Sequence, residues 1–295
     1  MITPPSKRFT LTDLRAARLS GRKVAMLTCY DYTTARLMDE AGVPALLVGD
    51  SAANVILGHE TTLPVKLEFM IEITAAVRRG APNALLFADM PFGSYQASAA
   101  QGVKNVARMV QLSGCDGVKL ETAEGHATLV KRLADAGVAV MAHLGLRPQS
   151  VNLLGGYKSQ GRTAEDAEAL VALAARMERS GAASILLEAV PPEVSAAVVA
   201  ATDVPVIGCG AGPACHGYVV VTQDALGLTP RPPRFVPQVA DIAGPMRKGF
   251  EEYVRRVSAG EYPSAEHNYE MPAGEKTKFI GRRSAGAARD GVPTL

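Results

Sequence analysis

Short apolar runs that end in a charged or titratable residue recur five times in this sequence, and this recurrence constrains the fold more than any other feature. The runs cover residues 45–51, 84–89, 117–121, 138–143 and 184–188. Runs this short and this uniformly apolar are typical of strands that are buried on both faces of a parallel sheet. In α/β proteins the chemistry lies beyond the carboxyl ends of such strands. The pattern therefore predicts a parallel sheet with a functional site at one edge.

Three further apolar runs, at 24–28, 204–208 and 218–221, bring the predicted strands to eight. Predicted helices separate most of them, and the clearest is 67–79, whose apolar residues recur at helical spacing. Eight strands that alternate with helices favour a single (β/α)8 barrel, here with an added N-terminal helix at about 10–20. An open doubly wound sheet stays the rival fold, because counting strands does not separate the two.

No linker, repeat or shift in composition divides residues 1–269, so we predict one barrel domain over this range. Its last helix spans about 241–258 and is expected to turn an apolar side inward. The residues of that side are Ile242, Met246, Phe250, Tyr253 and Val257. Residues 270–295 are polar and rich in Gly, Ala and Arg, which predicts a disordered tail.

Composition excludes several classes of function. The net charge of +2 on 295 residues offers no electrostatic case for nucleic acid. No apolar run approaches the roughly 18 residues that a membrane span requires, and the N-terminus lacks the apolar core of a signal peptide. The four cysteines lie far apart or inside apolar strands, which suits a reducing cytoplasm. We therefore expect a cytoplasmic protein that acts on small molecules.

In a barrel the strand ends converge on one mouth, where six titratable side chains would face one another. They are Asp50, Asp89, Lys119, Glu121, His143 and Glu188. The carboxylates suit a hard divalent ion such as Mg²⁺, which takes oxygen ligands and leaves positions open for substrate. Lys119 would balance an anionic substrate, and His143 and Glu188 are candidates for acid–base chemistry. Any one of these residues alone could be an ordinary solvated strand end, but six around one mouth indicate a site.

A series of longer motifs then runs in order along residues 10–265. The motifs are TCYDY at 28–32, VGDS at 48–51, GHETTLP at 58–64, AVRRGAP at 76–82, ADMPF at 88–92, VKLE at 118–121, HLGLRPQS at 143–150, GGYKSQG at 155–161, EAVP at 188–191 and GCGAG at 208–212. Together they resemble the ketopantoate hydroxymethyltransferase family.

The resemblance implies a (β/α)8 barrel of the phosphoenolpyruvate/pyruvate type that uses Mg²⁺. It implies transfer of a hydroxymethyl group from 5,10-methylenetetrahydrofolate to 3-methyl-2-oxobutanoate, giving 2-dehydropantoate for pantothenate and coenzyme A synthesis through a metal-held enolate. It also implies a large homo-oligomer, a decamer. The implied metal site is Asp50, Asp89 and Glu121 (Glu121 directly or through water), the implied substrate site is Asp50, Ser51, Asp89, Lys119, Tyr30 and His143, and the implied base is Glu188.

Three short segments depart from the pattern expected for this family. The chain has Ala52-Ala53-Asn54 for Leu-Gly-Met, Thr122-Ala123 for Gly-Gly, and His216, Tyr218 and Gln223 for Asp, Gln and His. The metal and base positions are kept, so the departures put the substrate in doubt more than the reaction. A paralogue acting on a different 2-oxo acid stays open, as do a folate-independent lyase or mutase of the same barrel group and a non-catalytic oligomer. Retention of Asp50, Asp89, Lys119 and Glu188 argues against the last.

Overall fold

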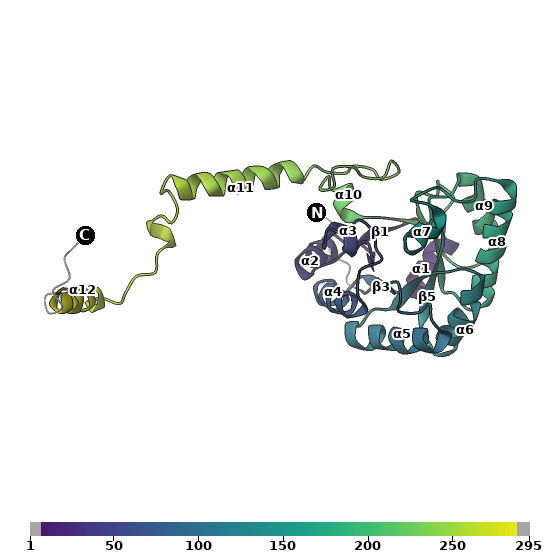
Figure 1. The fold of residues 1–295 in the computed structure, drawn as a ribbon, viewed down its shortest axis with the longest axis horizontal. Coiled ribbons are helices and arrows are strands. Elements are labelled where there is room, and N and C mark those ends of the chain that lie inside the picture. The colour runs from purple at the N-terminus through teal and green to yellow at the C-terminus, as the bar shows by residue number, and fades with distance from the viewer. Residues whose placement is uncertain (1–6, 288–295) are drawn as a thin grey trace. The chain divides into compact units, whose positions relative to one another are not determined.

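The computed structural model describes residues 7–287 and contains a closed barrel of eight parallel strands (Figure 1). Each strand pairs with the next in sequence, and the eighth returns to pair with the first. The strands are β1 (Val24–Thr28), β2 (Ala45–Val48), β3 (Leu85–Asp89), β4 (Gly117–Glu121), β5 (Ala139–Gly145), β6 (Ser184–Glu188), β7 (Val206–Cys209) and β8 (Gly217–Val220). The predicted barrel is confirmed, and the open sheet is excluded.

Helices connect most of the strands and cover the barrel. A capping box between Thr10 and Asp13 begins the N-terminal helix, α1, as the sequence predicts. The longer helices are α1 (Leu11–Leu19), α2 (Tyr32–Glu40), α4 (Leu67–Gly80), α5 (Ala99–Ser113), α6 (Ala127–Asp135), α8 (Ala164–Arg179) and α9 (Pro192–Ala201). Shorter turns lie in the loops: α3 (Ala52–Val55), η1 (Glu124–His126), η2 (Pro148–Ser150), α7 (Val151–Leu154) and α10 (Thr222–Ala225).

The core has two layers, because neighbouring strand residues point to opposite faces. Leu47, Phe87 and Met141 fill the inside of the barrel. Leu46 and Leu86 point outward and pack with residues of the surrounding helices. Each such buried side chain stabilises the fold by about 1.5–3 kcal/mol relative to exposure. The requirement for apolar residues on both faces explains why the strands read as uninterrupted apolar runs.

Residue contacts divide the chain into two compact units, Met1–Asp241 and Ile242–Leu295. The division falls earlier than the boundary we predict after residue 269. It places the helix α11 (Ala243–Ser258) in the second unit, together with η3 (Ala265–His267) and α12 (Glu275–Ala287).

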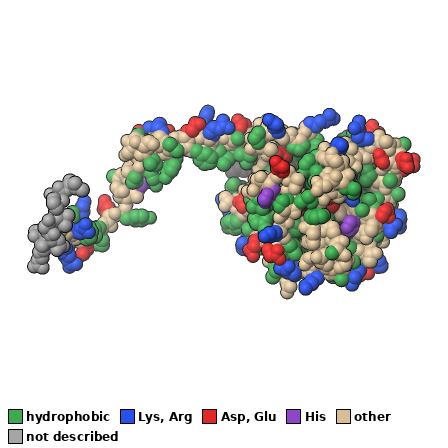
Figure 2. Space-filling model, in the orientation of Figure 1, with side chains coloured by type: hydrophobic (Ala, Val, Ile, Leu, Met, Phe, Trp, Pro, Cys, Tyr) green, Lys and Arg blue, Asp and Glu red, His purple; other side chains and the backbone are tan. Residues whose placement is uncertain are grey.

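The predicted helix near 241–258 is present as α11, but the prediction that its apolar side faces inward is wrong. None of its residues is buried, and Phe250, Tyr253 and Val254 are 64%, 59% and 63% exposed. Figure 2 shows hydrophobic side chains along one side of this helix. Helical periodicity identifies a side that suits burial, but it does not say which surface covers that side.

The predicted disordered tail is also corrected, because α12 occupies much of it. The composition that suggested disorder includes Glu, Lys, Arg and Ala, which are strong helix formers. Lys278 pairs with Glu275 at 2.7 Å, one turn apart on this exposed helix. The rest of the predicted tail, residues 288–295, lies outside the described residues. Among the described helices, none combines the length and apolar character needed to cross a bilayer.

Candidate active site

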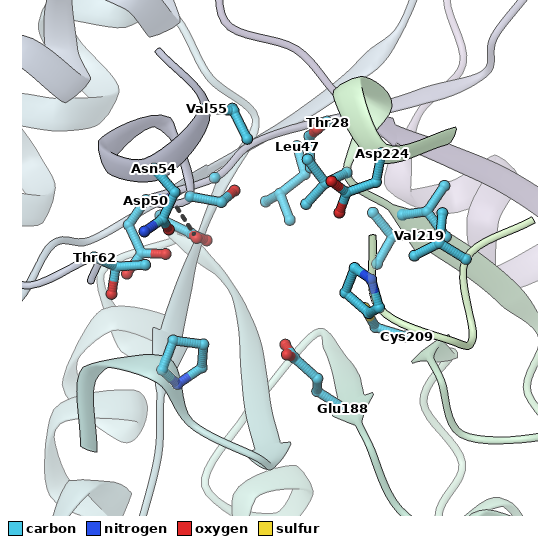
Figure 3. Close-up of a pocket in the computed structure, with 18 of the residues that line it drawn as sticks. Thr28, Leu47, Asp50, Asn54, Val55, Thr62, Glu188, Cys209, Val219 and Asp224 are labelled. Carbon is cyan, nitrogen blue, oxygen red and sulfur yellow. Dashed lines mark hydrogen bonds between the residues drawn. The ribbon is translucent and has the colours of Figure 1, made fainter. Parts of the chain in front are cut away.

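A cavity of about 390 Å³ opens where the strands end at the carboxyl-terminal mouth of the barrel (Figure 3). Six of the eight predicted site residues line it: Asp50, Ser51, Asp89, Lys119, His143 and Glu188. The other two lie directly behind its wall. Tyr30 bonds through its hydroxyl to Ser51 Oγ at 2.8 Å, and Glu121 is buried on β4, two residues from Lys119. The convergence of strand ends that the sequence predicts is therefore present.

Asp89 and Lys119 form a buried ion pair next to Asp50. Lys119 Nζ lies 3.1 Å from Asp89 Oδ2, and the backbone N–H of Asp50 donates to the same oxygen at 2.9 Å. Burial raises the pKa of Asp89 to about 7, and the charge of Asp50 adds to this, although Lys119 opposes it. Burial alone would lower the pKa of Lys119, but Asp89, Asp50 and Glu121 together raise it above its ordinary value. Lys119 therefore stays charged among the carboxylates.

Glu121 adds a third buried carboxylate to this group. Both of its carboxylate oxygens accept from the backbone N–H of Gln149, at 3.0 and 3.2 Å. Burial raises the pKa of Glu121 to about 8, with a further rise from the charge of Asp50. Three carboxylates around one ammonium leave an excess of potential negative charge, which favours a bound cation.

Gln149 is a site residue that the sequence reasoning missed. Its side-chain Nε2 donates to Asp50 Oδ2 at 2.8 Å and to the carbonyl of Met90 at 3.0 Å. Its Oε1 accepts from the hydroxyl of Tyr95 at 2.9 Å. With its backbone N–H on Glu121, this one residue connects two of the three carboxylates. Gln149 lies in the HLGLRPQS motif at 143–150, but a neutral amide in a loop gives no indication of a functional role from its residue type alone.

His143 lies between Lys119 and Glu188. Lys119 Nζ is 3.2 Å from His143 Nδ1. On the other side of the ring, His143 Nε2 is 3.3 Å from Glu188 Oε2, but this nitrogen makes no hydrogen bond within the described part of the chain. Burial lowers the pKa of His143 well below its ordinary value, and the charge of Lys119 adds to this. The imidazole is therefore neutral. Because the Lys119 ammonium donates to Nδ1, the proton of the ring belongs on Nε2, the nitrogen that faces Glu188.

Glu188 ends β6 and points into the cavity (Figure 3). Burial raises the pKa of this carboxyl group to about 7, with Lys119 opposing the shift. A carboxylate with a pKa near neutral pH can take up a proton and release it again under physiological conditions. Glu188 lies beside His143 and outside the Gln149 hydrogen bonds that hold Asp50 and Glu121.

The donor set at the mouth fits a magnesium ion. Asp89 Oδ1 is buried and accepts no hydrogen bond from any of the described residues, so a lone-pair donor is available. Within residues 7–287, no group of three His, Cys, Asp or Glu side chains is placed so that it could hold a metal ion by itself. Mg²⁺ is typically held by one or two carboxylates, with water and substrate completing its shell. Asp50 and Asp89, with Glu121 behind them, match that kind of open site.

The departures from the family pattern lie mostly away from the cavity. Among these substituted residues, all within the described part of the chain, Asn54 alone lines it. Asn54 Nδ2 donates to the carbonyl of His59 at 2.8 Å. Thr122 hydrogen-bonds the carbonyl of His143 through its backbone N–H, and His216 Nδ1 accepts from the backbone of Val206. The cavity thus differs from the expected pattern mainly at one wall residue.

Known proteins of one family resemble this chain over most of its length. The chain matches the family Ketopantoate hydroxymethyltransferase over residues 8–265. It is 47% identical over 264 residues to the 3-methyl-2-oxobutanoate hydroxymethyltransferase of Thermobifida fusca, covering 90% of this chain and 94% of that protein. It is 44% identical over 275 residues to the protein of the same name from Desulfotalea psychrophila, covering 93% and 99%.

Solved structures agree on the fold. A 2,3-dimethylmalate lyase, described as a member of the PEP mutase/isocitrate lyase superfamily, superimposes with a TM-score of 0.55 and 17% identity over 98% of each chain. A phosphonopyruvate hydrolase in complex with oxalate and Mg²⁺ gives a TM-score of 0.55 and 15% identity over 96% of this chain and 99% of that one. This likeness agrees with the (β/α)8 barrel of the chain. The chain is a hydroxymethyltransferase and belongs to the ketopantoate hydroxymethyltransferase family.

Proposed function

We propose that this enzyme transfers a hydroxymethyl group from 5,10-methylenetetrahydrofolate to 3-methyl-2-oxobutanoate, giving 2-dehydropantoate for pantothenate synthesis in the cytoplasm. The names of the relatives support the acceptor and the product. The observation that carries the proposal is the placement of Glu188, whose pKa is about 7, across one small cavity from Asp50, Asp89 and Lys119. Deprotonation beside a ketone requires a base and a site that stabilises the negative charge of the enolate. Glu188 would be the base, while the carboxylates would bind a cation and Lys119 would bind the anionic substrate.

Asp50 and Asp89 would hold Mg²⁺, with Glu121 close to it, directly or through water. When bound, Mg²⁺ polarises the ketone of a 2-oxo acid and so makes its C3–H more acidic. A phosphonopyruvate hydrolase of similar fold has been solved in complex with oxalate and Mg²⁺, which supports the use of this ion. Gln149 fixes the positions of Asp50 and Glu121, so that these carboxylates need little rearrangement on binding.

Lys119 and Ser51 would bind the carboxylate of the 2-oxo acid, and Tyr30 would orient the Ser51 hydroxyl. His143, neutral and buried, lies beside Glu188, with Nε2 3.3 Å from Glu188 Oε2, and would restrict the positions that this carboxylate can take. Glu188 would then remove the C3 proton. With a pKa of about 7, much of it is ionised at neutral pH, yet it is far more basic than an exposed glutamate.

The remaining steps join the acceptor to the one-carbon unit. A C–C bond forms between C3 and the methylene carbon, and both bonds from that carbon to the folate nitrogens break. Water supplies the hydroxyl oxygen, while the C3 proton and the remaining water proton finish on the two nitrogens. Tetrahydrofolate leaves as the second product. The loop over residues 144–162, which contributes Pro148 and Tyr157 to the cavity, would shield these steps from bulk water.

A panel of acceptors tests this proposal. Product formation from 3-methyl-2-oxobutanoate, 2-oxobutanoate and longer-chain 2-oxo acids would be followed by mass spectrometry, with and without 5,10-methylenetetrahydrofolate. We expect folate-dependent turnover with 3-methyl-2-oxobutanoate as the best acceptor. Preference for another acid would favour the second candidate function, a paralogue that acts on a different 2-oxo acid. The polar side chain of Asn54 in the cavity wall supports that candidate. Turnover without folate would favour a lyase or mutase.

We also propose that the chain works as a homo-oligomer, a decamer by resemblance to the family. The apolar side of α11 supports this, because a soluble protein rarely leaves so many large apolar side chains of one helix in water. A second copy of the chain is the partner that is always present at matching concentration. Light scattering after size-exclusion chromatography measures the mass, and a monomer would contradict the proposal.

A further inference from the structure

The cavity extends past the residues that bind and deprotonate the 2-oxo acid. Its far wall is built by β8 and the segment after it, including Val219, Val221, Asp224 and Phe235. Figure 3 shows Asp224 on the opposite side of the cavity from Asp50, with its carboxylate directed into the open space. None of these side chains has a part in the chemistry described above.

Asp224 is an unusual residue to find there, because it is only 6% exposed and carries a carboxylate. Within residues 7–287 the carboxylate makes no hydrogen bond and no ion pair. Its oxygens face the open cavity, where no donor from residues 7–287 competes for them. A ligand that brings N–H donors to this wall would find a charged acceptor in place.

The position of Asp224 is fixed by the backbone rather than by its own side chain. The N–H of Thr222 donates to Thr28 Oγ1 at 3.0 Å, and Thr222 Oγ1 donates to the carbonyl of Thr28 at 2.6 Å. These bonds tie the start of α10 to the end of β1, two residues before Asp224. The carboxylate is thus presented to the cavity on a rigid support.

Phe235 provides a flat apolar surface on the same side of the cavity. Its ring lies over the glycine turn after β7, where Gly210 has a φ of +67° and a Cβ atom would approach the ring to 2.7 Å. The turn therefore needs glycine in order to admit the aromatic ring, which is half-buried. An aromatic face beside the two acceptor oxygens of a carboxylate suits a planar, nitrogen-rich ring.

The chemistry of the two substrates decides which of them uses this wall. A 2-oxo acid is an anion with acceptor atoms only, so Asp224 would repel it. The pterin ring of a reduced folate carries a ring N–H next to an exocyclic amino group. These two donors lie side by side, the arrangement that one carboxylate accepts in a bidentate manner. We propose that Asp224 binds the pterin ring of the one-carbon donor through these two donors, with Phe235 against the face of the ring.

This inference rests on the proposed function, and the test separates the two. Asp224→Asn keeps the size of the side chain but replaces one acceptor by a donor. We expect the dissociation constant for tetrahydrofolate, measured by calorimetry, and the KM for 5,10-methylenetetrahydrofolate to rise about 10- to 100-fold, the range for hydrogen bonds to a charged acceptor. Deuterium exchange at C3 of 3-methyl-2-oxobutanoate without folate should stay within about twofold of wild type, which also establishes that the variant is folded.

Two further measurements sharpen the result. Phe235→Leu should raise the same two folate constants without changing C3 exchange, whereas Asp135→Asn, at an exposed position of α6, should change neither. A tetrahydrofolate analogue without the 2-amino group should bind wild type weakly and lose nothing more in Asp224→Asn. Unchanged folate affinity in Asp224→Asn, or an equal loss of C3 exchange, would overturn the assignment. Failure of wild type to bind tetrahydrofolate would instead overturn the proposed function.

Discussion

Gln149 Nε2 donates to Asp50 Oδ2 at 2.8 Å, joining two residues that lie 99 positions apart in the sequence. The same glutamine donates from its backbone to Glu121 and accepts from Tyr95, so it forms the centre of a buried polar network. Such networks hold carboxylates in one arrangement before any ligand arrives. Gln149 is accordingly the residue through which the geometry of the proposed metal site is best tested.

Gln149→Ala is expected to weaken Mg²⁺ binding by about tenfold, the lower end of the range for loss of a residue that orients metal ligands. Asp50 would lose its amide donor, while the backbone bond to Glu121 would remain. Titration calorimetry with Mg²⁺, or Mn²⁺ binding followed by electron paramagnetic resonance, measures the affinity without turnover. Gln111→Ala, at an exposed position of α5, serves as the control. Equal affinities for the two variants would count against the proposed role.

The rate of the reaction should depend on the ionisation of Glu188. Only the carboxylate form accepts a proton, and burial raises its pKa to about 7. The rate should therefore rise about tenfold per pH unit below this value and level off above it. The measurement is C3 exchange at saturating Mg²⁺ between pH 5 and 9. An acidic limb centred near pH 4.5, the ordinary value for glutamate, would show that Glu188 is not the base or is not desolvated.

Glu188 should also make folding stability depend on pH. Its carboxyl group has a pKa of about 7 in the folded state against an ordinary value of 4.5, so the folded state holds a proton that the unfolded state releases. Stability from this group is full below about pH 4.5 and is lost as the pH rises toward 7, by at most about 3 kcal/mol. Glu188→Gln should therefore be more stable than wild type at pH 8 and equal to it near pH 4.5. Urea unfolding at the two pH values would show it, and an equal difference at both would contradict the shift.

The apolar side of α11 should govern assembly. Phe250→Asp and Val254→Asp place a charge among the exposed apolar residues of that side and are expected to lower the oligomeric mass. Lys248→Asp introduces the same side chain at an exposed polar position of the helix and should leave the mass unchanged. Light scattering after size-exclusion chromatography gives the masses. If the Phe250 and Val254 variants retained the wild-type mass, α11 would not be an interface.

The periodicity of the sequence determines where strands lie and which way their side chains point, whereas other features of the fold depend on contacts between distant residues. The strand ends, with Asp89, Lys119 and Glu188 on them, could be predicted because apolar runs and strand alternation fix both the element and the direction of its last residues. Gln149 and Asp224 could not be found that way, since each reaches the site from a loop or a single helical turn. The exposure of α11 could not be predicted either, because an amphipathic pattern is the same whether the apolar side packs against the same chain or against another molecule.

Deuterium exchange at C3 of 3-methyl-2-oxobutanoate, followed by NMR in the absence of folate, shows whether Glu188 removes the C3 proton. We expect exchange that requires Mg²⁺ in wild type and that falls by about 100-fold or more in Glu188→Gln, within the contribution expected of a general base. Mg²⁺ affinity should stay unchanged in that variant, because Glu188 stands across the cavity from Asp50 (Figure 3). Absence of exchange in folded wild-type protein that binds Mg²⁺, or full exchange in Glu188→Gln, would contradict the account.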